Sequence, residues 1–137
     1  MTEALLLDTC ACLWLTRGDP LHRGARDAID QAQVVGAVFV SAITAWEVAT
    51  LVRRNRYQLK VTVEAWFARL MALPGLRLAG LEPRILIASA ELPGAPPADP
   101  ADRMICATAR ARSLAVVTRD ERILAYGGAG FVNVVPC

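Results

Sequence analysis

The stretch Ala4-Leu5-Leu6-Leu7-Asp8-Thr9 places a carboxylate directly after four consecutive apolar residues. A short, uninterrupted apolar run is typical of a strand that is buried on both faces of a parallel sheet. The same arrangement returns at Ala115-Val116-Val117-Thr118-Arg119-Asp120, where an acid again follows an apolar run. Asp8 and Asp120 are therefore expected at the edge of the sheet where these two strands end.

Apolar runs and amphipathic patterns alternate along the rest of the chain. Further strands are expected at residues 38–40, 76–81 and 131–135, and helices at 9–15, 21–34, 41–54, 63–73, 84–92 and 99–112. This alternation predicts the α/β class, with a central parallel sheet of about five strands covered by helices on both faces. In the strand order 3-2-1-4-5, the first and fourth strands are neighbours where the order reverses, and ligands bind at that point.

Two more acids are expected at the same edge of the sheet. Glu47 is the only charged residue between Asp30 and Arg53, and it falls in the second turn of the helix after the second strand. Asp102 opens the helix that returns toward the fourth strand. Four carboxylates that converge on one point form a site for a hard cation, and such a site suits phosphate chemistry.

Helix capping is the alternative role for three of these acids. Asp8 can cap a helix that begins at Thr9. The pattern Asp99-Pro100-Ala101-Asp102 is typical of an N-cap, a proline at the first helical position and an acid in the first turn. In Thr118-Arg119-Asp120-Glu121, the threonine is expected to be the cap and the glutamate to occupy the third helical position, which leaves the aspartate free. For Glu47, the alternative to a place in the cation site is an ordinary solvent-facing position on its helix.

The composition predicts a single domain over residues 1–137, because this length is close to the usual ~100–150 residues. Hydrophobic residues make up 55% of the chain, above the common ~45–50%, so a partner is expected to cover part of the excess. A net charge of +2 gives no strong polybasic signal for nucleic acid or for a membrane surface, and the longest uncharged run is too short to span a bilayer. A cytoplasmic protein without a membrane segment is expected.

The cysteine, histidine and aromatic residues predict packing more than chemistry. The four cysteines contain no C-x-x-C pair and His22 is the only histidine, which argues against a zinc site. Trp14, Trp46, Trp66 and Phe67 are expected in the core.

Arginine supplies nearly all of the positive charge, since Lys60 is the only lysine. The guanidinium group offers phosphate a planar pair of donors. Arg103 and Arg119 each adjoin a candidate acid, so they are the preferred candidates for phosphate contacts. The cluster Arg53-Arg54-Asn55-Arg56 ends a predicted helix, where cations favour the helix dipole, and contact with phosphate is its second interpretation.

The segments that carry the candidate acids are LLLDT at residues 5–9, SAITAWEVA at 41–49, DPADRMICATA at 99–109 and VTRD at 117–120. In this order and spacing, over nearly the whole chain, they resemble the PIN-domain family and most closely its VapC branch, the ribonuclease toxins of bacterial toxin–antitoxin pairs. The resemblance implies an α/β/α sandwich and a Mg²⁺- or Mn²⁺-dependent endoribonuclease that leaves 5′-phosphate and 3′-hydroxyl ends on its RNA substrate. It also implies a VapB-type antitoxin as partner, and a homodimer.

Carried over residue by residue, the family's acidic quartet, which is both catalytic and metal-binding, corresponds to Asp8, Glu47, Asp102 and Asp120. Its supporting hydroxyls correspond to Thr9 and Thr118. Asp99 is close enough to Asp102 that the assignment of the ligand between these two stays open, and Asp99 is kept as a supporting residue. Arg103 and Arg119 become candidates for RNA binding.

Other families with acidic sites fit less well. Response-regulator receivers need a lysine at the end of a late strand, and Lys60 is not there. Haloacid-dehalogenase phosphatases need a second aspartate two residues after the first, where this chain has Cys10. The alternative that remains is a catalytically silent PIN-fold scaffold or binding module.

Overall fold

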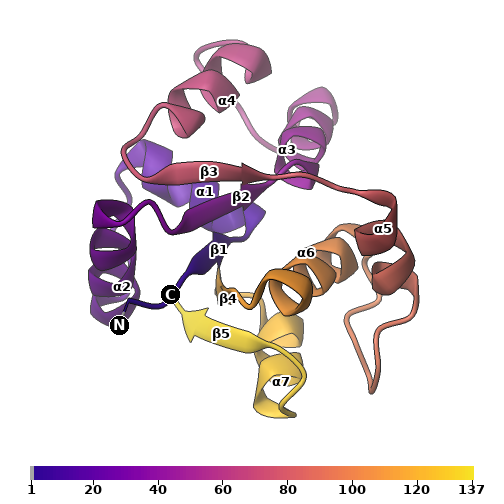
Figure 1. The fold of residues 1–137 in the computed structure, drawn as a ribbon. Coiled ribbons are helices and arrows are strands. Elements are labelled where there is room, and N and C mark those ends of the chain that lie inside the picture. Colours follow the sequence, from indigo (N-terminus) through magenta and orange to yellow (C-terminus); the bar gives the residue numbers. More distant parts are fainter. Residues whose placement is uncertain (1) are drawn as a thin grey trace.

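The computed structural model describes residues 2–137 and contains a five-stranded sheet with helices on both faces (Figure 1). The elements in chain order are β1 (Leu5–Leu7), α1 (Thr9–Arg17), α2 (Arg23–Val34), β2 (Val38–Ser41), α3 (Ile43–Arg53), α4 (Val63–Met71), β3 (Leu76–Ala79), α5 (Pro83–Ala90), α6 (Pro100–Arg112), β4 (Ala115–Thr118), α7 (Glu121–Gly128) and β5 (Asn133–Pro136). The strand order is β3-β2-β1-β4-β5, and every neighbouring pair is parallel. The predicted α/β class, the sandwich and the strand order 3-2-1-4-5 are confirmed.

Strand β1 lies at the centre of the sheet, between β2 and β4. Its three leucines are fully buried. Leu5 and Leu7 belong to the core on one face of the sheet, and Leu6 belongs to the core on the other face. Because successive side chains of a strand point to opposite faces, a strand that is covered on both sides is apolar at every position.

Two hydrophobic cores hold the helices against the sheet. The core under α1, α2 and α4 includes Ile29, Trp66 and Leu70, none of which is more than 5% exposed. The core under α6 and α7 includes Ile105 and Tyr126. Helices α1, α3 and α7 start where β1, β2 and β4 end, and α6 starts at the same edge because it returns to β4. Four helix N-termini therefore surround the carboxyl edge of the sheet.

The structure adds one helix to the sequence-based expectation and places one tryptophan on the surface. Residues 121–128 form the additional helix α7, of which only the capping pattern was apparent in the sequence. Trp46 was expected in the core but is 61% exposed, whereas Trp66 is buried as expected. The buried positions of α3 are Thr44 and Val48, four residues apart on one face, and Trp46 projects from the opposite face.

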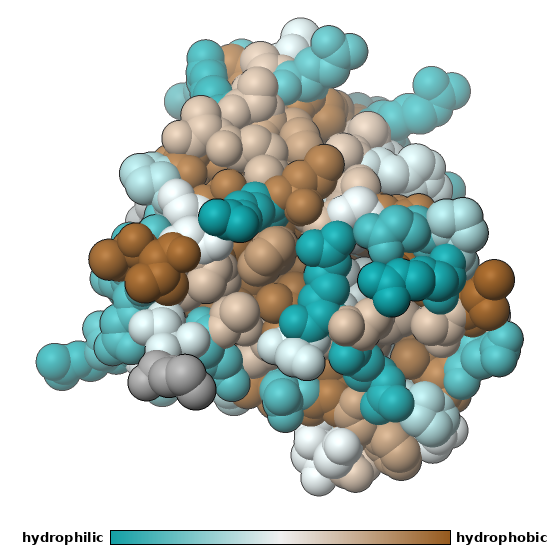
Figure 2. Space-filling view, viewed as in Figure 1, coloured by the Kyte–Doolittle hydropathy of each residue, from teal (hydrophilic) through white to brown (hydrophobic). Residues whose placement is uncertain are grey.

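Part of the apolar content lies on the surface. The exposed large apolar side chains are Val34, Val35, Trp46, Leu78, Leu86 and Ile87. In Figure 2, apolar surface extends over α4 and the adjoining part of the sheet, whereas hydrophilic side chains gather over the region of α5 and α6. No helix in the described range of 2–137 is both long and apolar enough to cross a membrane.

The turn before β3 depends on a glycine. Gly75 has φ +77°, and a Cβ atom there would lie 2.1 Å from the carbonyl oxygen of Gln33 in α2. Gly18 has a similar φ of +73°, but no atom lies within 4 Å of its Cβ position, which makes it a matched control.

We expect Gly18→Ala to lower the free energy of unfolding by about 1–2 kcal/mol, the strain of an L-residue in the left-handed region. Gly75→Ala should lower it by more than about 3 kcal/mol, because the backbone of α2 must also move. Urea denaturation of the two variants measures the difference, and equal losses would contradict the close approach of α2 to this turn.

Candidate functional site

A pocket of about 300 Å³ opens at the carboxyl edge of the sheet, beside the ends of β1 and β4. The lining residues are Asp8, Thr9, Cys10, Trp14, Glu47, Asp102, Arg119 and Asp120. The structure thus brings the four predicted acids together, although they come from four separate segments of the chain. Of the other predicted site residues, Thr9 and Arg119 also line the pocket, and Thr118, Asp99 and Arg103 do not.

Asp8 is both a helix cap and a wall of the pocket. It is the N-cap of α1, and its Oδ1 accepts a hydrogen bond of 2.8 Å from the backbone N–H of Ala11. Its Oδ2 accepts a hydrogen bond of 2.6 Å from the hydroxyl of Thr118, at the end of β4. The carboxyl group is only 6% exposed, so these two bonds fix its orientation.

Asp120 has a role that the sequence pattern assigned to another residue. Thr118 was expected to cap α7, but Asp120 is the cap, because its Oδ1 accepts hydrogen bonds from the backbone N–H groups of Arg122 and Ile123 at 2.9 and 3.1 Å. The Thr118 hydroxyl instead accepts a bond of 3.0 Å from the backbone N–H of Asp120. One hydroxyl therefore contacts both strand-end acids.

Glu47 is held by Thr9, which in turn contacts a second threonine, Thr44. The Thr9 hydroxyl donates to Glu47 Oε1, and it also lies 3.4 Å from the hydroxyl of Thr44 on the buried face of α3. Because Thr9 is the first residue of α1, this contact joins the start of α1 to α3. The glutamate side chain is thereby directed to the pocket and away from the solvent-facing position that was its alternative.

Asp102 enters the pocket from the first turn of α6. Asp99 is the N-cap of this helix and accepts a hydrogen bond of 3.0 Å from the backbone N–H of Asp102, as the capping pattern predicts. Arg103 donates from Nε, Nη1 and Nη2 to the carbonyl oxygens of Ser89, Pro97 and Ala90 at 2.8, 3.3 and 3.1 Å. Arg103 therefore anchors the α5–α6 connection and positions Asp102; its contact with RNA stays a prediction.

Burial and the neighbouring negative charges raise the pKa of three acids of the pocket, which are Asp8, Glu47 and Asp102. Burial, and then the negative charges of Asp99 and of the other acids of the pocket, raise the pKa of Asp102 from 3.8 to about 7. Burial likewise raises the pKa of Asp8 and of Glu47, although their hydrogen bonds from threonine hydroxyls act in the opposite direction. The pocket therefore concentrates negative charge that the protein alone does not neutralise.

Two pocket residues were not identified as site residues from the sequence. Trp14 was expected in the core, but it is only half-buried and lies under the guanidinium of Arg119, whose Cζ is 3.9 Å from the ring centroid. The Nε of Arg119 donates to the carbonyl oxygen of Cys137 at 2.8 Å, so two contacts orient this cation beside the acids. Cys10 is an exposed residue at the pocket. Partial burial of its thiol and the negative charges of the surrounding carboxylates raise the pKa of this thiol to about 11. The sequence does indicate that these two residues lie together, because a spacing of four places Cys10 and Trp14 on one face of α1.

The donor atoms of the pocket suit a hard divalent cation. All four acids offer carboxylate oxygens, the ligands that Mg²⁺ and Mn²⁺ prefer, and a cation would offset the repulsion that raises the pKa of Asp102. Within residues 2–137, no three histidine, cysteine, aspartate or glutamate side chains converge closely enough to form a complete metal-binding group. The chemistry of the donor set therefore fits a metal, and the acids that would hold it are spread around the walls of the pocket.

Comparisons with known proteins agree with this geometry. The chain is 33% identical over 126 residues to Ribonuclease VapC22 of Mycobacterium tuberculosis, which covers 92% of this chain and 93% of that protein. The fold is similar to the structure of VapBC2 from Rickettsia felis bound to a promoter DNA fragment, with a TM-score of 0.65, 13% identity and coverage of 98% of both chains. It is also similar to FitAcB from Neisseria gonorrhoeae, with a TM-score of 0.62, 24% identity and coverage of 95% of both chains.

The family assignment rests on the sequence as a whole. The model of the PIN domain matches residues 5–129, which extend from β1 through the end of α7 and contain every acid of the pocket. The resemblance inferred from four short segments is therefore confirmed over most of the chain. This protein belongs to the PIN-domain family.

Proposed function

We propose that this chain is a VapC-type ribonuclease, the toxin of a toxin–antitoxin pair, and that it cleaves RNA with Mg²⁺ or Mn²⁺ held by Asp8, Glu47, Asp102 and Asp120. The observation that carries the proposal is the gathering of these carboxylates, from four segments, in one pocket. The identity to a VapC ribonuclease over 92% of the chain supports it. A catalytically silent scaffold, the alternative, has no need for this costly concentration of charge.

The proposed division of labour follows from the contacts in the pocket. A divalent ion supplies, when bound, Lewis-acid activation of water and neutralisation of charge on the scissile phosphate. Thr118 and Thr9 hold Asp8 and Glu47 in the orientations that binding requires. Cleavage between phosphorus and the 3′-oxygen leaves 5′-phosphate and 3′-hydroxyl ends.

Arg119 is the proposed phosphate contact of the pocket. Stacking on Trp14 and the hydrogen bond from Nε to the Cys137 carbonyl hold the guanidinium, and Nη1 and Nη2 remain for the non-bridging oxygens of a phosphate.

The proposed mechanism does not use the single histidine. His22 caps α2, where its Nδ1 accepts a hydrogen bond from the backbone N–H of Gly24, and it does not line the pocket.

The proposed partner is a VapB-type antitoxin. The similar structures are toxin–antitoxin assemblies, among them a toxin-antitoxin complex from Klebsiella pneumoniae with a TM-score of 0.62 and 23% identity. The exposed apolar side chains of α3, β3 and α5 supply surface for an antitoxin and for a homodimer; these are Trp46, Leu78, Leu86 and Ile87.

We expect purified protein to cleave single-stranded or looped RNA in Mg²⁺ or Mn²⁺ and to lose this activity in EDTA. Asp8→Asn, Glu47→Gln and Asp102→Asn should each lower the cleavage rate by more than about 100-fold, because loss of a ligand exceeds the ~10–100-fold effect of losing an outer-shell partner. Gel analysis of end-labelled RNA measures the rates and identifies the product ends.

Asp27→Asn is the matched control, since Asp27 is exposed on α2 and does not line the pocket. The wild-type and control proteins should also arrest growth when expressed alone, and the three pocket variants should not. Cleavage that persists in EDTA would overturn the metal requirement. A soluble wild-type protein without activity would favour the scaffold.

Thr118→Val should affect stability and activity together, because it removes the hydroxyl that donates to Asp8 and accepts from the backbone of Asp120. We expect a loss of about 1–3 kcal/mol in the free energy of unfolding and of about 10–100-fold in cleavage rate. Thr118→Ser keeps the hydroxyl and should recover most of the activity. Denaturation and cleavage assays test this, and a fully active Thr118→Val variant would show that Asp8 needs no positioning.

The metal-free protein should become less stable as the pH rises. The pKa of Asp102 is about 7 in the folded protein and ~3.9 in the unfolded chain, so its stabilising effect is complete below pH ~4 and is lost as the pH passes ~7. Relative to wild type, Asp102→Asn should remove about 1–2 kcal/mol of this pH dependence after solvent screening. Thermal melts in EDTA from pH 4 to 8 measure it, and parallel profiles for the two proteins would contradict the raised pKa.

A further inference from the structure

A second and larger depression lies at the C-terminal end of α1. Its volume is about 1020 Å³, against about 300 Å³ for the acidic pocket, and its walls come from α1, α4 and the loop between α3 and α4. Its charged lining residues are Arg17, Asp19, Arg56, Lys60 and Arg69. This basic groove carries a local charge of +3, whereas the whole chain carries only +2. The groove is therefore a local excess of positive charge.

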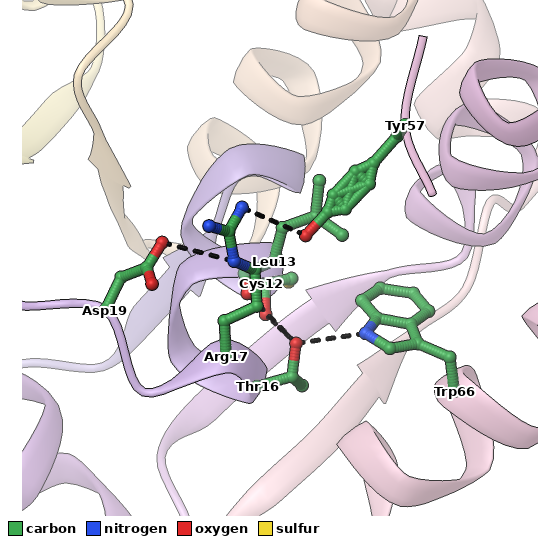
Figure 3. A network of polar contacts seen from close by, with 7 residues as sticks. All are labelled: Cys12, Leu13, Thr16, Arg17, Asp19, Tyr57 and Trp66. Carbon is green, nitrogen blue, oxygen red and sulfur yellow. Dashed lines mark hydrogen bonds and ion pairs between the residues drawn. The ribbon is translucent and has the colours of Figure 1, made fainter. Parts of the chain in front are cut away.

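Hydrogen bonds hold the walls of the basic groove together, as Figure 3 shows. The indole Nε1 of Trp66, on α4, donates to the hydroxyl of Thr16 at 3.0 Å. Arg17 donates from Nη1 to the Tyr57 hydroxyl at 3.3 Å, and its Nε lies 3.4 Å from a carboxylate oxygen of Asp19. Because Trp66 is only 5% exposed, α1 and α4 form a fixed wall and the groove exists before a ligand arrives.

The remaining cations of the groove are available to a ligand. Arg56, Lys60 and Arg69 are exposed, and none of them forms an ion pair with another residue of the described range 2–137. Exposed cations without acidic partners raise the local concentration of anions and attract polyanions.

One face of α1 connects the basic groove to the acidic pocket. Cys10, Trp14 and Arg17 are spaced by four and three residues, so they form one stripe along the helix. Cys10 and Trp14 line the acidic pocket and Arg17 lines the basic groove. Seven residues of helix span about 10 Å, so the two sites lie a few nucleotides apart along a strand.

We propose that the basic groove, through Arg17, Arg56, Lys60 and Arg69, binds the phosphates of a single-stranded RNA segment whose neighbouring phosphodiester enters the acidic pocket. This inference rests on the proposed ribonuclease function. The acidic pocket offers RNA one guanidinium, that of Arg119, beside four carboxylates, so most of the affinity for the RNA backbone is expected from cations outside the pocket. The basic groove supplies such cations about 10 Å farther along α1, and single-stranded nucleic acid binds in positively charged grooves.

An acidic polypeptide is the other polyanion that such a groove attracts. RNA is favoured because the groove lies on the same helix, α1, as the pocket where a phosphodiester is proposed to react, and because three of its four cations are arginines, whose donor pairs match phosphate.

The binding test compares two triple variants with the same loss of charge. The groove variant carries Arg56→Gln, Lys60→Gln and Arg69→Gln, and leaves Arg17 because it supports the wall. The control variant carries substitutions to Gln at exposed cations of α2 and α5, which do not line the groove: Arg23, Arg26 and Arg84. Both are made in an Asp8→Asn background and titrated in EDTA with single-stranded RNA of about 16 nucleotides, so that no cleavage occurs.

The groove variant should bind this RNA at least about 10-fold more weakly than the control variant. The slope of log Kd against log salt concentration should fall by about 2 for the groove variant, because each lost phosphate contact removes about 0.7 on a single strand. Replacing Arg56 and Arg69 by Lys, with Lys60 kept, should restore the slope, which separates loss of charge from loss of shape. Equal affinities and slopes for the two triple variants would overturn the proposal, and so would unchanged RNA binding with weakened binding of a poly-glutamate probe.

Cleavage assays with Asp8 intact separate this inference from the proposed function. The groove variant should lose at least about 10-fold more activity on RNA of about 16 nucleotides than on RNA of about 4 nucleotides, which fits within the acidic pocket and its surroundings. Equal losses of activity on the two RNA lengths would overturn the proposal that the groove binds RNA. A wild-type protein that binds the longer RNA through the groove but cleaves neither would overturn the ribonuclease proposal alone.

Discussion

The hydrogen bond of 2.6 Å from the Thr118 hydroxyl to Asp8 Oδ2 joins the ends of the two strands at the centre of the site. It can form only because β1 and β4 are parallel neighbours, with Leu7 paired to Val117 directly before Asp8 and Thr118. The same hydroxyl accepts from the backbone of Asp120, so one buried side chain holds both strand-end acids. The order of the strands in the sheet thus fixes the spacing between the two residues Asp8 and Asp120.

The acids of the site also begin the helices around it. Asp8, Asp99 and Asp120 are the N-caps of α1, α6 and α7, and each accepts backbone hydrogen bonds. Capping and site formation are therefore compatible, because a carboxylate that binds a helix N-terminus through one oxygen presents its other oxygen elsewhere. The Ala11 N–H at the start of α1 favours the charged form of Asp8, whereas burial and the neighbouring acids disfavour charge on Asp102 and raise its pKa to about 7.

The charge of the molecule is divided between two places along α1. Acids gather where α1 begins, and cations gather where it ends, so the net charge of +2 hides two strong and opposite local charges. The arrangement is consistent with a substrate that needs negative ligands at one of its atoms and positive contacts along its backbone. Arg119, stacked on Trp14, is the one cation that lines the acidic pocket.

Local patterns in the sequence determined the alternation of strands and helices, except for α7, together with the burial of β1 and the cap at Asp99, because each depends on spacing within a few residues. The four acids could be placed at one edge because each lies at a strand end or in the first turns of a neighbouring helix, and parallel strands end at a common edge. Tertiary structure alone decided that Asp120 and not Thr118 caps α7, that Arg103 binds the main chain, and that Trp46 faces solvent. It also assembled the basic groove from Arg17, Arg56, Lys60 and Arg69. These features depend on distances between segments far apart in the chain, and such distances exist only once the helices have packed against the sheet.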